Sequence, residues 1–400
     1  MPATRRLLVI AAVFAAATAL PVQAQVQAAD APAASCRAQG AFARAAYTSV
    51  EPLTDGRVTF RLCAPEASEV RVTSTDIDPA IPAGFGGGER GLIMTRDAAG
   101  LWTGTTAIPI PADTYRFNFE VDGARVPDPM AETFSRERSG INSTFEIAGP
   151  EGAFQTYAPA VPHGAVTRIE YWSAAVDGKR EAFVYTPPGY MNNAERYPVL
   201  YLVHGAGDSA DSWTSVGHAN YIADNLIAAG GAQPMIIVMP FGHTPDRPGV
   251  NMLANTDFGD DLIANLIPYV EANFRTINDA DHRAMAGLSM GGAHTLNFGV
   301  PRPDLFGEVG VFSMGLGLGN PGAIADFEQA HAAQLQARAA MAEPVYYAIG
   351  TDDFLYGSAA PTLAMFERAG IAAHYNETGG GHTWINWRRY LADFLPRLFQ

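Results

Sequence analysis

The sequence has a single lysine and only two cysteines among its 400 residues, and its 26 basic side chains are outnumbered by 41 acidic ones. The formal net charge of −15 argues against nucleic acid or an anionic membrane surface as a partner. Neither Cys36 nor Cys63 lies near a histidine cluster, so we expect no metal site, and nothing in the chain predicts a cofactor. Beyond the N-terminus, no apolar run reaches the roughly 20 residues that a membrane-spanning helix needs. The chain is nevertheless 48% hydrophobic, which is enough for a sizeable core.

The first 24 residues have the pattern of a secretory signal peptide. Arg5 and Arg6 form a charged segment, residues 7–20 are apolar, and Val22 and Ala24 supply small residues before a cleavage site. We therefore expect a periplasmic or secreted protein with no membrane contact after cleavage, and a mature charge of −17 (−15 minus the two arginines). Residues 25–45 are alanine-rich and predict a tether. An oxidising compartment permits a disulfide between the two cysteines, but the residue pattern leaves their pairing open.

Two contrasting patterns divide the rest of the chain. Residues 46–148 contain short runs of alternating apolar and polar side chains separated by Gly, Pro and Asp, which is typical of a small β-sandwich. Residues 149–166 are rich in proline and glycine and predict a linker. In residues 167–400, near-continuous apolar runs alternate with helical patterns, as in a parallel sheet covered by helices. We predict an all-β domain followed by an α/β domain, with strands near residues 199–203, 235–239, 284–288, 309–312 and 345–349.

The run Gly287-Leu288-Ser289-Met290-Gly291-Gly292 directly follows one of these predicted strands. A G-x-S-x-G sequence in this position forms a nucleophile elbow, in which a sharp turn lifts the serine hydroxyl clear of the sheet. Ester cleavage by a serine also needs an orienting carboxylate and a base, which follow in that order on an α/β-hydrolase scaffold. Asp352 and Asp353 end a later predicted strand, and three glycines lead to His382 after the strand-like residues 372–377. Adjacent residues of an extended segment point to opposite sides, so one aspartate should face the imidazole, and the pattern leaves open which one.

The same chemistry requires two preorganised N–H donors for the oxyanion. We expect one from the backbone of Met290, directly after the serine, and the other from Ala206, in the loop that follows the strand at 199–203. His163 lies in the predicted linker. Four further histidines are expected on surfaces or at helix ends: His218, His282, His294 and His331.

Taken together, the second domain resembles the putative-esterase family, which contains the feruloyl and acetylxylan esterases of carbohydrate esterase family one, esterase D, enterochelin esterase and the mycolyltransferases. The resemblance covers roughly residues 163–399. The family pattern G-T-x-D implies that Asp353 is the catalytic aspartate, and the family supports Ser289 and His382 beside the oxyanion donors Met290 and Ala206. Trp384, shortly after the histidine, is a candidate for the wall of an aromatic acyl pocket. The matching segments are residues 180–190, 197–205, 287–292, 350–353 and 380–382 together with Trp213.

The first domain resembles the early-set, immunoglobulin-like carbohydrate-binding module of glycogen-branching enzymes and isoamylases, on residues 58–67, 100–102, 115–123 and 128–129. Cys63 stands where that module usually has an aromatic residue, and Trp102 is the only tryptophan before the linker. We interpret Trp102 as a packing residue. Whether the domain binds glycan stays open, and the alternative is that it helps to shape the esterase cleft.

The resemblance implies a secreted serine carboxylic-ester hydrolase that removes feruloyl or acetyl groups from plant polysaccharides or oligosaccharides. Two alternatives remain. An enterochelin-esterase-like siderophore hydrolase would take an anionic substrate, which a chain this acidic, with Lys179 as its single lysine, fits less well. A non-catalytic glycan-binding protein on a hydrolase fold is disfavoured by the complete set of serine, aspartate and histidine.

Overall fold

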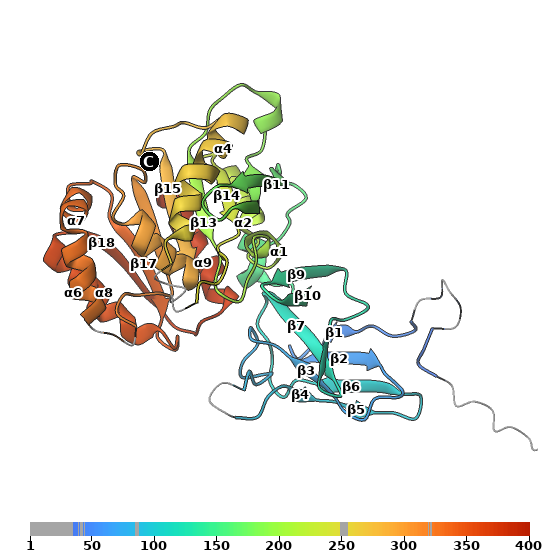
Figure 1. Ribbon diagram of the computed structural model, residues 1–400. Coiled ribbons are helices and arrows are strands. Elements are labelled where there is room, and N and C mark those ends of the chain that lie inside the picture. Colours follow the sequence, from blue (N-terminus) through green and yellow to red (C-terminus); the bar gives the residue numbers. More distant parts are fainter. Residues whose placement is uncertain are drawn as a thin grey trace, which may run out of the picture.

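A computed structural model describes residues 35–38, 40, 43, 45–84, 88–248, 255–318, 320 and 322–400. The predicted signal peptide and most of the predicted tether lie outside these residues. Figure 1 shows two domains, an N-terminal β domain drawn in blue and teal and a larger α/β domain drawn in green to red. Among the helices of the described residues, none has both the length and the apolar character of a membrane span.

The first domain is a sandwich of two antiparallel sheets. One sheet has the order β1-β2-β6-β5 and the other the order β4-β3-β7-β10-β9, with β8 pairing to β7. Alternate side chains turn inward and form an aromatic core in which the rings of Phe60 and Phe117 lie 5.3 Å apart. Trp102 is buried there, and its indole N–H donates to the Ala64 carbonyl at 2.9 Å, as expected of a packing residue. The strands are β1 (Val50–Pro52), β2 (Val58–Cys63), β3 (Val70–Thr73), β4 (Leu92–Ile93), β5 (Thr95–Arg96), β6 (Leu101–Thr105), β7 (Thr114–Val121), β8 (Ala124–Val126), β9 (Thr133–Glu137) and β10 (Gly140–Glu146).

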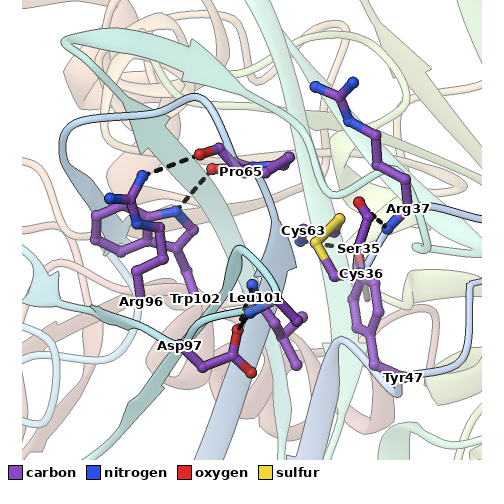
Figure 2. Close-up of a disulfide and its surroundings, with 12 residues drawn as sticks. Ser35, Cys36, Arg37, Tyr47, Cys63, Pro65, Arg96, Asp97, Leu101 and Trp102 are labelled. Atoms are coloured by element: carbon purple, nitrogen blue, oxygen red, sulfur yellow. Dashed lines mark hydrogen bonds between the residues drawn. A yellow bond between two sulfur atoms is a disulfide. The ribbon is translucent and has the colours of Figure 1, made fainter. Parts of the chain in front are cut away.

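A disulfide joins Cys36 to Cys63 at the end of β2 (Figure 2). The backbone N–H of Cys36 also donates to the Ala99 carbonyl at 2.9 Å, and that of Cys63 to the Tyr47 hydroxyl at 3.2 Å. The pairing that the sequence left open is therefore formed, and it fastens part of the predicted tether to the sandwich.

The second domain is built on an eight-stranded sheet in the order β11-β12-β14-β13-β15-β16-β17-β18. The six strands from β14 to β18 in this order run parallel, and all of them correspond to runs expected from the sequence. An antiparallel hairpin that the sequence analysis did not predict, β11 with β12, extends the edge. The strands are β11 (Ala165–Ser173), β12 (Gly178–Thr186), β13 (Val199–Val203), β14 (Ile236–Pro240), β15 (Arg283–Leu288), β16 (Glu308–Phe312), β17 (Val345–Gly350) and β18 (Ala373–Thr378).

Helices cover both faces of this sheet, so successive strand residues are buried on opposite sides. On β13, Tyr201 packs with the cluster under α3 to α8, whereas Leu200 and Leu202 pack with the cluster under α1, α2 and α9. Burial on both faces explains why these strands appear as continuous apolar runs. The helices are α1 (Ser212–Ser215), α2 (Ala219–Ala228), α3 (Asp257–Asp261), α4 (Ile267–Asn273), α5 (Met290–His294), α6 (Gly322–Ala330), α7 (Ala332–Ala339), α8 (Ala359–Ala369) and α9 (Trp384–Phe394).

The segment between the domains is packed rather than loose. It contains a 3-10 helix, η2 (Pro150–Gln155), that lies against α2. Asn225 of α2 donates to the carbonyls of Phe154 and Thr156 at 3.0 and 3.1 Å, and the imidazole of His218 hydrogen-bonds the Gln155 carbonyl through Nδ1. The connection is therefore anchored to the second domain before β11 begins at Ala165.

Candidate active site

Ser289 occupies the turn between β15 and α5, with φ 52° and ψ −116°. A positive φ is strained for a residue with a side chain, and such strain concentrates at functional sites. The turn is held by a hydrogen bond of 2.9 Å from the Ser289 N–H to the Phe312 carbonyl on β16. Leu288 and Met290 on either side are buried, while Ser289 itself is partly exposed. The backbone thus presents the hydroxyl at the carboxyl end of the central strand.

The glycines around Ser289 are required by close packing. A Cβ on Gly287 would overlap the backbone of Gly291, and a Cβ on Gly291 would overlap the Val203 carbonyl at the end of β13. The strand before the serine and the helix after it therefore approach more closely than any side chain permits. This contact between neighbouring elements is the physical reason for the G-x-S-x-G pattern here.

Asp353 and His382 form a hydrogen-bonded pair after β17 and β18. Nδ1 of His382 lies 2.9 Å from both carboxylate oxygens of Asp353, which is 4% exposed, and the imidazole is partly exposed. A carboxylate only accepts hydrogen bonds, so Nδ1 must carry the proton, which leaves the lone pair of Nε2 available as a base. The geometry gives this contact to Asp353, as the family pattern implies.

Asp352 has a different contact. Its carboxylate accepts from the Gly380 N–H at 3.2 Å, and its own N–H donates to the Gly380 carbonyl at 3.1 Å. Gly350 packs so closely on Gly380 that a Cβ at position 350 would overlap that carbonyl. The aspartate and glycine of one loop therefore hold the glycine-rich loop of the other, which brings His382 to Asp353.

Ser289 and His382 lie at the same edge of the sheet, since β15 to β18 are parallel neighbours. The ring of Trp387 links their surroundings: it lies 5.0 Å from the His382 ring and donates from Nε1 to the hydroxyl of Ser313 at 2.9 Å. Ser313 directly follows Phe312, whose carbonyl accepts from Ser289. Within the described residues, no hydrogen bond joins Ser289 to His382 itself.

The predicted oxyanion loop lies against the serine. A Cβ on Gly205 would be 3.5 Å from the Ser289 Cβ and 2.7 Å from the end of the Leu288 side chain, so any other residue here would displace Leu288. The Asp208 N–H donates to the Gly205 carbonyl at 3.1 Å, which closes a tight turn through Ala206 and Gly207. We call residues 205–208 the oxyanion turn.

His204 braces this turn, a role that the sequence analysis missed. Its Nε2 accepts from the Gly242 N–H at 2.9 Å, so Nδ1 carries the proton and donates to the Gly205 carbonyl at 2.8 Å. Burial lowers the pKa of His204 to about 4, which keeps the ring neutral and this arrangement intact near neutral pH. The sequence His204-Gly205-Ala206-Gly207, directly after β13, is the feature from which this role could have been inferred.

Two histidines that were expected on surfaces or at helix ends are buried. His294 lies against the loop after β14, where Nε2 is 3.1 Å from the Gly242 carbonyl and the ring stacks on Phe258 at 4.1 Å. His218 is buried against η2. Both precede or end short helices, as predicted, but the sequence pattern did not show that other elements cover those helix ends.

Trp384 does not line a pocket. It is 0% exposed, and its ring packs edge-on against Trp213 and Trp387 at 5.1 and 5.2 Å. The expectation that it forms the wall of an acyl pocket is therefore wrong, because the first turn of α9 faces the core of the α1, α2 and α9 layer.

Two hollows lie on this side of the described structure, one beside α5 and one where the β11–β12 hairpin meets β9. An apolar cavity of about 590 Å³ lies beside α5 and is lined by Ala293, Leu296, Phe298, Met314, Leu316 and Phe327, among others. Ala293 donates its N–H to the Ser289 carbonyl at 2.9 Å, which places this cavity one helical turn from the serine. On the β14 side, a charged groove of about 660 Å³ is lined by Arg136, Arg138, Arg168, Glu170, Glu181 and His243, among others.

Comparisons with known proteins identify the family of this chain. The family model described as "Putative esterase" matches residues 173–398, more than half of the chain. An "Endo-1,4-beta-xylanase/feruloyl esterase" of Xylanibacter ruminicola is 36% identical over 271 residues, which cover 66% of this chain and 35% of that protein. The chain thus spans about a third of this relative's length.

Solved structures show the same fold. A ferulic acid esterase, 28% identical, aligns with a TM-score of 0.51 over 58% of this chain and 97% of its own. An enterochelin esterase from Shigella flexneri aligns with a TM-score of 0.61 over 88% of this chain and 95% of its own, at 18% identity, which is a likeness of fold alone.

Proposed function

The chain belongs to the putative esterase family, and from this premise we propose that it is a serine carboxylic-ester hydrolase that removes aromatic acyl groups, such as feruloyl, from polysaccharide or oligosaccharide. The observation that carries the proposal is the pair formed by Asp353 and His382. The pair leaves the Nε2 base free at the sheet edge where the strained Ser289 turn presents its hydroxyl.

In the proposed reaction, His382 Nε2 takes the proton of the Ser289 hydroxyl as the oxygen attacks the ester carbonyl. The N–H groups of Met290 and Ala206 stabilise the oxyanion that forms. His382 then gives the proton to the leaving sugar oxygen, which leaves an acyl-serine. Water, deprotonated by the same nitrogen, hydrolyses that ester and returns the serine. Asp353 holds the imidazole in the required tautomer and stabilises its charged form throughout. The reaction requires the Ser289 hydroxyl to come within hydrogen-bonding reach of Nε2 when substrate binds.

The two hollows support the proposal of a substrate ester with an apolar acyl group and a polar alcohol group. The apolar cavity beside Ala293 and Met314 is larger than an acetyl group needs and suits a planar aromatic acid. The groove on the other side offers paired arginines and carboxylates, which form hydrogen bonds with hydroxyl groups. Trp172, on the outward face of β11 together with Arg168 and Glu170 of this groove, is 64% exposed and offers a flat face to a sugar ring.

Export is part of the proposal. It is supported by the pattern of residues 1–24 and by the disulfide between Cys36 and Cys63, because such bonds persist in oxidising compartments.

The proposal is tested by mapping the nucleophile and the substrate in one preparation. The mature protein is treated with a fluorophosphonate, digested, and examined by mass spectrometry; we expect one adduct, on the peptide that contains Ser289. Turnover of methyl ferulate, 4-nitrophenyl acetate, acetylated xylan and a catecholate siderophore ester is then compared, with the highest kcat/KM expected for methyl ferulate. Absence of any adduct would favour a non-catalytic binding protein, and preference for the siderophore ester would favour the enterochelin-esterase alternative.

A further inference from the structure

The oxyanion turn is held from outside the catalytic domain. Arg116, on β7 of the sandwich, donates from one guanidinium nitrogen to the Asp208 carboxylate at 2.7 Å. The other two nitrogens bind the two oxygens of Asp76 at 3.0 and 3.1 Å. All three side chains are buried, with 4 to 7% of their surface exposed. A buried ion network therefore runs from the sandwich to the last residue of the oxyanion turn.

Backbone pairing adds a second tie at the same place. Glu137 at the end of β9 forms an antiparallel bridge with Asp208, and the Arg138 N–H donates to the Gly207 carbonyl at 3.2 Å. β9 also contacts α1, where the Ser215 and Ser135 hydroxyls lie 2.9 Å apart. Figure 1 shows β9 and β10 at the boundary of the two domains, beside α1. The carbonyls of Gly205 and Asp208 are thus held by His204 and His243 within the catalytic domain, and the carbonyl of Gly207 is held by the sandwich.

We infer that the sandwich is a working part of the active site, in which Arg116 acts through Asp208 as a positioning residue for the Ala206 N–H. This inference rests on the proposed function. An oxyanion donor contributes only when it is preorganised, and a displacement of about 1 Å costs roughly 10²-fold in rate. The turn contains two glycines, so its conformation is not fixed by the residues themselves. The cross-domain network supplies the missing constraint.

Replacement of Asp208 tests the inference, because it removes the hydrogen bond between Arg116 and the oxyanion turn. The ion pair of Arg116 with Asp76 remains, and its charges balance. Asp208→Ala leaves Arg116 bound to Asp76, whereas removing Arg116 would leave two buried carboxylates without a cation. We expect Asp208→Ala to lower kcat for methyl ferulate 10- to 100-fold with KM within about threefold. Asp208→Asn keeps an acceptor for Arg116 and should retain kcat within about fivefold.

A trifluoromethyl ketone, which binds Ser289 as an oxyanion, should lose affinity in Asp208→Ala in proportion to kcat/KM. Arg116→Lys, which keeps the charge but not the bidentate contact, is the second variant and should lower kcat at least fivefold.

The matched control is the other buried ion pair across the domain boundary. Arg388 of α9 donates to Asp113 at 2.6 Å, and both side chains are fully buried. Their other hydrogen bonds go to Val216, Thr114, Gln155 and Arg389 rather than to the oxyanion turn. Asp113→Asn should lower the melting temperature and leave kcat within about twofold. Equal losses of kcat in Asp113→Asn and Asp208→Ala, or unchanged kcat in Asp208→Ala and Arg116→Lys, would overturn the inference. If the wild type hydrolyses the ester and that activity depends on Ser289, these outcomes would leave the proposed function intact. If the wild type does not hydrolyse the ester, the proposed function itself is rejected.

Discussion

At the scale of single residues, the hydrogen-bond partners of each side chain determine its role in the site. Asp352 and Asp353 are adjacent and chemically identical, yet one carboxylate binds the Gly380 N–H and the other binds His382. The sequence predicted a catalytic aspartate at this strand end because acid, base and nucleophile follow a fixed order on the scaffold. The residues alone could not separate the two, because the separation depends on the path of a loop that arrives from the next strand.

Substitution of each aspartate by asparagine separates their roles. Asp353→Asn removes the acceptor that keeps the proton on Nδ1, so the imidazole can take the wrong tautomer, and we expect kcat to fall by about 10³- to 10⁴-fold. Asp352→Asn keeps an oxygen for the Gly380 N–H and should cost less than about tenfold. Steady-state hydrolysis of methyl ferulate measures both. A larger loss in Asp352→Asn than in Asp353→Asn would contradict the assignment.

At the scale of elements, the loops after β17 and β18 work as one unit. Glycines pack where the loops meet, and Asn386 of α9 donates to the carbonyls of Gly379 and Gly381 at 3.1 and 2.9 Å. The strands, the elbow and the glycine runs were predictable because their causes are local: apolar runs, tight turns and close packing. The β11–β12 hairpin and the burial of Trp384 were not, since both follow from packing against elements distant in the sequence.

A methyl group between these two loops should therefore separate the acid from the base. Gly350→Ala places a Cβ against the Gly380 carbonyl, and the flexible glycine loop is the element that must move. We expect kcat to fall at least tenfold while circular dichroism shows the same fold. Gly357→Ala, on the same stretch after β17 but with no atom within 4 Å of the added Cβ, is the control and should retain full activity. Unchanged turnover in Gly350→Ala would show that the loop contact does not position His382.

The apolar cavity beside α5 predicts the acyl preference. Leu316→Trp adds bulk to the lining of this cavity, so an aromatic acyl group would lose its space while an acetyl group would not. We expect kcat/KM for methyl ferulate to fall at least tenfold and that for 4-nitrophenyl acetate to stay within about threefold. Equal losses for the two substrates would argue against the cavity as the acyl site.

At the scale of the whole molecule, the two domains share one boundary of buried charges. Arg116 and Asp208 are 92 positions apart in the sequence and Arg388 and Asp113 are 275 apart. The sequence predicted the two domains because each has its own periodicity. It could not predict that they meet at the oxyanion turn, because no local pattern marks a contact between such distant residues.

Buried neutral histidines make the fold sensitive to acid. Burial, and next the charge of Arg388, lowers the pKa of His218 to about 4, against 6.5 in the unfolded chain. The unfolded state therefore binds more protons below pH 6.5, and stability falls as the pH drops from 6.5 towards 4, by up to about 1.4 kcal/mol per pH unit for this group.

Urea unfolding of the wild type and of His218→Gln at pH 7.5 and 5.5 measures this contribution. Glutamine can still donate to the Gln155 carbonyl but does not titrate, and groups common to both proteins cancel in the difference. We expect the wild type to lose about 1 kcal/mol more than the variant between the two pH values. An identical pH dependence in both proteins would contradict a neutral, buried His218.

The proposed hydrolysis depends most directly on Ser289 as the nucleophile. The decisive measurement is the initial rate of ester hydrolysis by the mature protein and by Ser289→Ala, with methyl ferulate and 4-nitrophenyl acetate as substrates and matched melting temperatures as proof of folding. We expect turnover by the wild type and a loss of at least about 10³-fold in the variant. Equal rates in the two proteins, or no turnover by either, would contradict it.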